Sequence, residues 1–498
     1  MYSFIQYFLI CSLGLLLPIT AHAETSVELP LQASLSTIWG IPFVGILLSI
    51  AIFPLVAPSF WHRHFGKISL FWAIAFILPF TIVFGLSSAV HVFLHAIMTE
   101  YIPFIMLLAA LYVVAGGICI KWQLPTSALA NTAWLALGGL LASIMGTTGA
   151  AILLIRPLLR ANQHRKHYVH VVIFFIFIVG NIGGALTPLG DPPLFLGFLN
   201  GIGFFWTTTH LFLPMLFICV LLLSIFYIYD QYQFSRYPVG NAQLQAANHL
   251  ANQTEYKAQA ISSENLKAAQ SRSNSSIFDG KINFILLAGV VITVLASGIW
   301  KTPNDLIILG NSMRLSDLIR NLVLLIILFI SLWLTPASAR RENEFNWDPI
   351  LEVAKLFFSI FITIAPVIMM LKEGQQGAFA SLIHLLSNAD GEPLNFRYFW
   401  ITGVLSAFLD NAPTYLVFFN MAGGNPSWLM EAGALTLMAI SAGSVFLGAL
   451  TYIGNAPNFM VKAIAESQGI KMPSFFGYMV WSGLILIPIL IAVSLIFF

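Results

Sequence analysis

The sequence predicts an all-α polytopic membrane protein built from two inverted repeats. Only 8% of the residues are charged and 58% are hydrophobic, with a mean hydropathy of +0.87, whereas a soluble domain carries roughly a quarter charged residues. Apolar runs of about 20 residues recur along the chain, each long enough to cross a bilayer core. Two of these apolar segments, 168–200 and 433–465, contain closely similar interruptions rich in glycine and proline.

The first 23 residues form the N-terminal element. An apolar core is followed by Ala21-His22-Ala23, the small-residue pattern of a signal-peptide cleavage site. We therefore expect residues 1–23 to be a removable signal peptide. Because no Lys or Arg precedes the apolar core, an uncleaved first helix is the alternative.

About ten membrane spans and two hairpins are expected after this element. The spans are predicted at 39–60, 68–88, 101–121, 168–200, 208–229, 283–300, 318–336, 350–371, 433–465 and 474–498. Segments 131–160 and 397–425 are also apolar, but polar stretches that disfavour a helix interrupt them at 145–149 and 409–414. We interpret both segments as hairpins that enter the membrane and return to the same side.

The basic residues orient these elements. With both hairpins returning, one face of the membrane receives Arg63, Lys67, Lys121, Arg160, Arg165, Lys166, Arg340, Arg341, Lys462 and Lys471. The opposite face keeps Lys301, Arg314, Arg320, Lys372 and Arg397. Because Lys and Arg concentrate in cytoplasmic loops, the first face is predicted to be cytoplasmic.

A polar stretch at 230–282 separates two membrane halves. Gln, Ala, Asn and Ser dominate it, which is typical of a solvated linker, and we expect this linker to be cytoplasmic. The predicted units are an N-terminal half, 24–229, with hairpin 131–160 and broken helix 168–200, and a C-terminal half, 283–498, with hairpin 397–425 and broken helix 433–465.

An internal repeat supports this division. Gly184–Phe195 and Gly448–Phe459 match at seven of twelve positions at an offset of 264 residues. The same offset carries Gly146, in the centre of the first hairpin, onto Asp410, in the centre of the second. Since the first hairpin enters from the cytoplasm and the second from outside, the repeats are inverted. Inverted repeats with discontinuous helices are typical of transporters whose site lies near the membrane midplane.

Prolines and glycines explain why helices 168–200 and 433–465 are interrupted. Pro188, Pro192 and Pro193 cannot continue a regular helix, and Gly190 and Gly454 tolerate the irregular backbone beside them. Backbone carbonyls freed in this way must face protein or a water-filled cavity, where they can serve as ion ligands.

Asp191 and Asp410 are the acids expected to carry the chemistry. A carboxylate at membrane depth costs at least about 2.5–3.5 kcal/mol, which a bound cation, a proton or dense hydrogen bonding can offset. Capping of a half-helix is the alternative role for each, and it does not exclude ion binding. We expect Asp191 and Asp410 to bind Na⁺, and desolvation of the empty carboxylate would let H⁺ replace it.

Two half-sites follow if each hairpin meets the broken helix of its own half. The first contains Thr147, Thr148, Thr187, Gly190 and Asp191, with Asn181 as a further ligand or a packing group. The second contains Asp410, Asn411, Thr414, Thr451, Gly454 and Asn455. Each offers one carboxylate with neutral oxygens, a donor set that suits a hard cation. Arg156 is expected to extend toward the cytoplasmic surface, with an anion-binding role as the alternative.

Several other functions find no support. No dinucleotide-binding, P-loop or zinc-protease motif is present, so we expect no enzyme activity, no cofactor and no nucleic-acid partner. The three cysteines are isolated in apolar surroundings and suggest packing. An aspartic-protease dyad is disfavoured because Asp191 follows Pro188-Leu189-Gly190 and not the Gly-x-Gly of intramembrane proteases.

The stretches GNIGGALTPLGDPPLFLGFL at 180–199, FNWDPILEVAKLF at 345–357 and LDNAPTYLVFF at 409–419 resemble carriers of the ion transporter superfamily. Specifically, the chain resembles NhaD-type sodium:proton antiporters and the related CitMHS-like citrate transporters. The resemblance implies a homodimer in the bacterial inner membrane, surrounded by lipid, with a scaffold and a mobile transport part that give alternating access of elevator type.

The hairpin tips bear on the substrate. Di- and tricarboxylate carriers of this superfamily typically hold Ser-Asn-Thr at both tips, whereas these tips are Gly146-Thr147-Thr148 and Asp410-Asn411-Ala412. An aspartate would repel a multiply charged anion unless a cation lay between them. This departure favours a sodium:proton antiporter that exports Na⁺ in exchange for H⁺. The alternatives are a Na⁺- or H⁺-coupled citrate or dicarboxylate transporter and another anion carrier, such as one for arsenite efflux.

Overall fold

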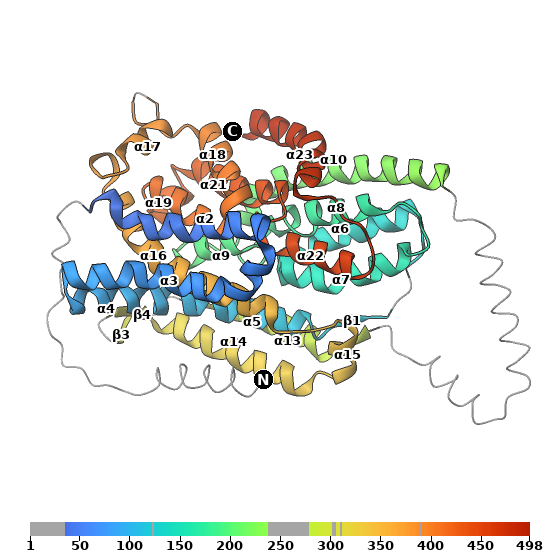
Figure 1. Cartoon of the computed structure of the whole chain (residues 1–498), viewed down its shortest axis with the longest axis horizontal. Coiled ribbons are helices and arrows are strands. Elements are labelled where there is room, and N and C mark those ends of the chain that lie inside the picture. The colour runs from blue at the N-terminus through green and yellow to red at the C-terminus, as the bar shows by residue number, and fades with distance from the viewer. Residues whose placement is uncertain (1–34, 122–123, 238–277, 301–304, 309–310, 389) are drawn as a thin grey trace, which may run out of the picture.

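The computed structural model describes residues 35–121, 124–237, 278–300, 305–308, 311–388 and 390–498. Most of them are helical (Figure 1). The expected signal peptide at 1–23 and most of the expected linker lie outside the described residues.

The elements are named in chain order. Before the linker they are η1 (Thr37–Gly40), α2 (Ile41–Val56), α3 (Pro58–Phe84), α4 (Leu86–His95), the π-helix η2 (Ala96–Tyr101), α5 (Ile102–Ala115), β1 (Cys119–Ile120), α6 (Ala128–Met145), α7 (Thr147–Asn162), α8 (Val169–Ile178), η3 (Ile182–Leu186), α9 (Pro192–Leu199) and α10 (Trp206–Arg236). After it come β2 (Phe278–Asp279), α13 (Ile282–Ile299), β3 (Asp305–Ile308), β4 (Asn311–Arg314), α14 (Leu315–Leu334), α15 (Ala337–Glu342), α16 (Asp348–Lys372), η4 (Gly374–Gln376), α17 (Ala380–Leu385), α18 (Asn395–Leu409), α19 (Asn411–Met421), α20 (Pro426–Met430), α21 (Ala434–Phe446), η5 (Leu447–Leu450), α22 (Ala456–Ser467) and α23 (Phe475–Phe497).

Length and composition make this a multi-pass membrane protein. Among the described residues, ten helices are long and apolar enough to cross a membrane. Large apolar side chains on their outer faces, such as Ile82 at 77% exposure and Leu484 at 75%, are suited to contact with lipid. The all-α polytopic class predicted from the sequence is therefore confirmed.

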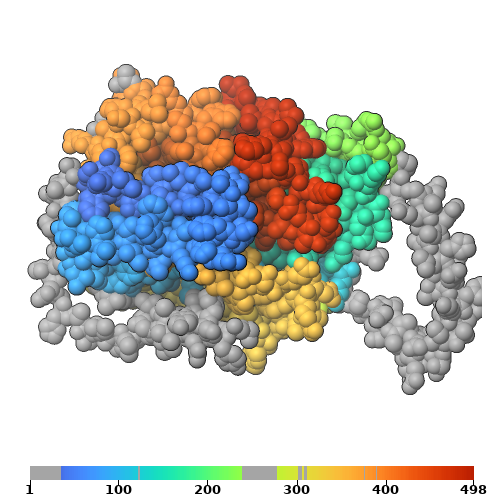
Figure 2. All heavy atoms as spheres, viewed as in Figure 1, coloured from blue at the N-terminus to red at the C-terminus, as the bar shows by residue number. Residues whose placement is uncertain are grey.

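The helices form two groups. In one, α16 packs on α3 and α14 packs on α5 and α13. The other group contains α6 to α10 and α18 to α23, in which α18 packs on α21, α9 on α19, and α22 on α7 and α8. Contacts of α16 with α19 and of α5 with α7 join the groups. Figure 2 shows helices of the first group, in blue, beside the red C-terminal segment of the second.

Several element boundaries differ from the sequence prediction. The span expected at 101–121 is a continuous helical run from Leu86 to Ala115, made of α4, η2 and α5. Arg63 and Lys67, expected in a loop between two spans, lie inside α3, because Pro58 starts that helix directly after the break at Ala57. α10 continues to Arg236, past the expected start of the linker at residue 230. It continues because the Asp230 carboxylate is fully buried and paired, so this acid does not mark a solvated segment.

Both expected hairpins are pairs of packed helices that meet at a single residue. α6 and α7 are joined at Gly146, with φ 81° and ψ 150°, and α18 and α19 are joined at Asp410, with φ 80° and ψ 141°. The same left-handed break therefore occurs at two positions that the repeat offset relates. Entry of each hairpin from its own side of the membrane stays a prediction.

Cys119 should be unreactive in the folded protein. Its Sγ donates a hydrogen bond to Glu342 Oε2 at 3.0 Å, and burial, followed by the adjacent Glu342 carboxylate, raises the pKa of the thiol to about 12. The thiolate, which is the nucleophile, is therefore scarce at neutral pH. With Cys11 and Cys219 replaced by alanine, we expect slow maleimide labelling at pH 7 and rapid labelling after denaturation. Fast labelling of the native protein would contradict this packing.

Candidate functional site

The two broken helices share the same construction. In the first, α8 gives way to the short helix η3, an irregular stretch follows, and α9 begins at Pro192. In the second, α21 gives way to η5, and α22 begins at Ala456. Thr187 and Thr451 are both extended, with φ, ψ of −140°, 160° and −133°, 165°. The residues before the two outgoing helices, Asp191 and Asn455, are extended as well.

Equivalent hydrogen bonds fix each hairpin to the broken helix of its own half. The Thr187 hydroxyl donates to the Ser143 carbonyl, and the Thr451 hydroxyl donates to the Ala407 carbonyl. The same threonine oxygens accept backbone N–H groups two residues ahead, from Leu189 at 3.1 Å and Ile453 at 3.2 Å. Each hairpin is thus joined to the broken helix of its own half by the same pair of hydrogen bonds.

The Asp191 carboxylate is the centre where the two half-sites meet. Its Oδ1 accepts hydrogen bonds from Thr147 Oγ1 at 3.1 Å and Asn455 Nδ2 at 2.9 Å, and its Oδ2 accepts one from Asn411 Nδ2 at 2.5 Å. Thr147 belongs to the first hairpin, Asn411 to the second, and Asn455 to the second broken helix. Predicted residues of both half-sites therefore meet at one carboxylate, with residues of the second half surrounding the acid of the first; ion binding at this place stays a prediction.

Asp410 has a different role in the same region. Its Oδ1 accepts the backbone N–H of Ala412 at 3.2 Å, so it caps α19, and its carbonyl accepts the Thr414 hydroxyl at 2.7 Å. Capping is the alternative role named for this acid above, and it does not exclude ion binding. Asp410 and Asp191 line one common cavity, so both can face the same ion.

Asn181 connects the halves one layer behind Asp191. Its Nδ2 donates to Asn458 Oδ1 at 2.7 Å and to the Ile176 carbonyl at 2.8 Å, and its Oδ1 accepts from Asn455 Nδ2 at 3.3 Å. It orients Asn455 and does not itself contact Asp191. The sequence analysis missed Asn458. Its equivalent position in the first repeat is the apolar Leu194, so an amide side chain within an apolar half-helix was the signal that could have found it.

Gly190 allows the backbone of the broken helix to close on itself. The Gly190 carbonyl accepts the Thr147 N–H at 2.9 Å, and a Cβ at Gly190 would lie 2.1 Å from the Gly184 carbonyl oxygen. Gly454 makes the equivalent approach to Gly448, at 2.6 Å. The glycines of both motifs are therefore needed for backbone contact.

Gly190→Ala should disrupt the site. The added methyl group meets a rigid backbone atom, so Asp191 must move away from its donors, and we expect transport to fall to background while membrane insertion is retained. Gly483→Ala on α23 is the matched control, since a Cβ there meets nothing within 4 Å. Normal transport by Gly190→Ala would argue against this backbone geometry.

A cavity of about 830 Å³ leads away from the carboxylates. Asp191, Asp410, Thr148 and Asn455 line it at the hairpin tips, and Arg156, Glu344 and Lys462 line it elsewhere. Arg156 and Lys462 are predicted to lie toward the cytoplasmic face, so the cavity is expected to extend from the carboxylates toward that face.

The donor set suits a hard cation. Within the described ranges, no group of three or more His, Cys, Asp or Glu side chains could hold a metal ion. Around Asp191 lie one carboxylate, a threonine hydroxyl and two amides, and Asn411 Oδ1 is buried without a hydrogen-bond partner. Oxygens of this kind bind Na⁺ or other hard cations, while transition metals prefer imidazole or thiolate.

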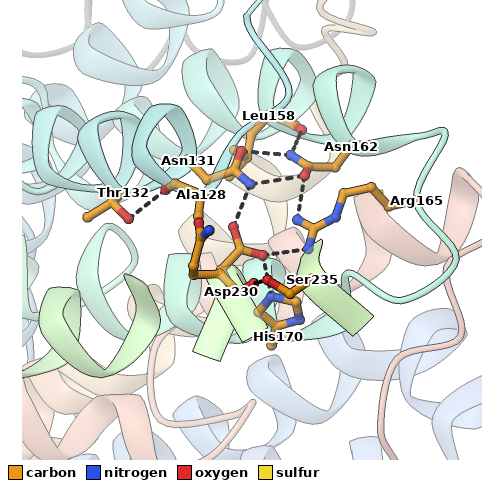
Figure 3. Close-up of polar contacts among 10 residues, drawn as sticks. Ala128, Asn131, Thr132, Leu158, Asn162, Arg165, His170, Asp230 and Ser235 are labelled. Carbon is orange, nitrogen blue, oxygen red and sulfur yellow. Dashed lines mark hydrogen bonds and ion pairs between the residues drawn. The ribbon is translucent and has the colours of Figure 1, made fainter. Parts of the chain in front are cut away.

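A second buried polar network lies around Asp230 (Figure 3). Asp230 Oδ1 lies 2.6 Å from Arg165 Nη2 and 2.8 Å from His170 Nε2, and Oδ2 accepts from Asn131 Nδ2 at 2.9 Å. Asn162 bonds both Asn131 and Arg165. The network ties both arms of the first hairpin to α8 and α10. The sequence analysis placed Arg165 at the predicted cytoplasmic face and Asp230 at the start of the solvated linker. The aromatic residues on both sides of Asp230 were the signal that this acid is buried.

Comparison with known proteins identifies the family. The sequence model of a protein family described as putative citrate transport matches residues 32–498. A comparison with curated proteins returned no match. The matched range covers both hairpins, both broken helices and every residue around Asp191. The chain therefore belongs to the putative citrate transport family, a family of secondary transporters.

Proposed function

We propose that this protein exchanges Na⁺ for H⁺ at Asp191, with Asp410 as the second acid of the site. The observation that carries the proposal is the surrounding of Asp191, which is 2% exposed and accepts hydrogen bonds from three uncharged side chains. No Lys or Arg within the described residues forms an ion pair with it. An unpaired buried carboxylate is costly, and a bound Na⁺ or proton removes that cost.

Competition between the two ions would give exchange. Na⁺ requires the ionised carboxylate and H⁺ neutralises it, so one ion leaves when the other binds. Donors from both halves around one carboxylate favour a site that closes and opens as the halves move, as in transporters with inverted repeats. We place this exchanger in the bacterial inner membrane as a homodimer, as the resemblance to ion transporter superfamily carriers implies. The distribution of basic residues favours a cytoplasmic linker.

Cation-coupled transport of citrate or a dicarboxylate is the second candidate. Two observations favour it: the description of the family, and a cavity of about 830 Å³, far larger than the roughly 30 Å³ that a water molecule occupies in the liquid. In this function Na⁺ or H⁺ at Asp191 would be the coupling ion. The cation would also reduce the repulsion between the aspartates and an anionic substrate.

Everted membrane vesicles distinguish the two functions. Vesicles containing the protein are energised, and proton movement is followed with a fluorescent dye as Na⁺ or Li⁺ is added, while labelled citrate uptake is measured in parallel. Exchange predicts proton release on adding the cation without citrate. Citrate uptake that depends on Na⁺ or a proton gradient, without cation-induced proton release, would overturn exchange and favour the second candidate.

A further inference from the structure

The cavity wall contains a buried arginine that the cation site does not use. Arg156 lies on α7, is 8% exposed and lines the same cavity as Asp191. Its Nη2 lies 3.0 Å from Glu344 Oε2, while its Nε is buried without a hydrogen-bond partner. Only part of the guanidinium fork is therefore occupied.

The geometry points to Arg156 as a binding residue for a carboxylate group of a small di- or tricarboxylate. This inference rests on the second candidate function, and it assigns the substrate class to a particular residue. A carboxylate bound side-on would engage Nε and Nη2 together, which is the strongest arrangement available to an arginine. Glu344 occupies Nη2 in this structure and marks where that carboxylate would bind.

Glu344 is a replaceable partner. Its side chain is 70% exposed, whereas that of Arg156 is 9% exposed. The released glutamate would be hydrated by water at little cost, but the buried guanidinium would be left with an uncompensated charge. Whatever displaces Glu344 must therefore be an anion.

The cation site does not prevent an anion from binding here. Thr147, which contacts Asp191, and Arg156 lie on one helix, and their nine-residue separation corresponds to about 14 Å along the helix axis at 1.5 Å per residue. A carboxylate in hydrogen-bond contact with the guanidinium is much nearer to Arg156 than to Asp191. Because the Coulomb energy falls with distance, attraction by Arg156 outweighs repulsion by Asp191. Asp348 and Glu352 also line the cavity, which restricts favourable anion binding to the part beside Arg156.

Four variants test the assignment by calorimetric titration of the purified full-length transporter with citrate, and with succinate as a second probe, at constant Na⁺. Arg156→Gln should weaken citrate binding about tenfold or more, as expected for losing hydrogen bonds to a charged group. Arg156→Lys should restore part of it, because the charge remains without the fork. Glu344→Gln should strengthen binding, because the competing carboxylate is gone.

Arg160→Gln is the matched control. Arg160 lies one turn along the same helix, is exposed, and donates to the Ile120 carbonyl without lining the cavity; its removal should leave citrate affinity unchanged. Equal affinity in wild type and Arg156→Gln, or no citrate binding by the wild type, overturns the inference. Na⁺-induced proton movement reports the Asp191 site independently, so failure of exchange with intact Arg156-dependent binding leaves this inference standing.

Discussion

Asp191→Asn should abolish cation-driven transport while the protein remains folded. Asparagine has nearly the shape of aspartate but can neither take up a proton nor bring negative charge to Na⁺. The new amide would also place a hydrogen-bond donor where Asp191 accepts hydrogen bonds from Thr147, Asn411 and Asn455. At least one of these contacts would then be lost. We expect Na⁺-induced proton movement in vesicles to fall to background, with normal amounts of protein in the membrane.

Two further variants make this result specific. Asp390→Asn, at an exposed acid outside the cavity, should transport normally. Asp410→Asn should keep its backbone, because asparagine tolerates positive φ and also caps helices, but it should require more Na⁺ for half-maximal exchange. If Asp191→Asn retained cation-induced proton movement, Asp191 would not be the ion-binding residue, and Asp410 would be the next candidate.

Asp230→Ala should produce the largest loss of stability away from the proposed ion site. The carboxylate is fully buried and compensates Arg165, while also binding His170 and Asn131. Removing one partner of a buried ion pair typically costs about 3–5 kcal/mol, because the other charge stays in a low-dielectric interior. The apparent melting temperature of the purified protein in detergent should fall clearly.

Glu466→Gln provides the comparison for an exposed pair. Glu466 lies 2.9 Å from Lys462, and its side chain is 42% exposed, so its loss should cost only about 0–1 kcal/mol. Asp230→Ala should still exchange ions at a temperature where it remains folded, because Asp230 does not line the main cavity. Equal melting shifts for the two variants would show that the Asp230 network adds little stability.

The local features of this protein could be predicted from its sequence, because they depend on residues close together in the chain. The prolines around Gly190 and the polar centres at Gly146 and Asp410 gave the correct positions of the helix breaks. The offset of 264 residues also paired positions with matching backbone conformations, including Asp191 with Asn455.

Contacts between the halves could not be predicted in this way. The repeat offset relates a residue to its counterpart but gives no position of one half against the other. Asn411 and Asn455 reach Asp191 across 220 and 264 residues, and hydropathy carries no signal for such pairing. The same limit applied to Asp230, whose burial depends on partners 60 and 99 residues away. An isolated acid near the end of an apolar run therefore resembled the start of a linker.

The two polar networks also differ in when they can form during synthesis. Every partner of Asp230 precedes it in the chain, so this network can be complete before the second half leaves the ribosome. Among the described residues of its own half, Asp191 has Thr147 as its one side-chain donor, and it must wait for Asn411 and Asn455. The N-terminal half can thus become a stable unit early, while the proposed ion site is complete only after the second half inserts. Two separately expressed halves, divided in the linker, should therefore recover transport when produced together.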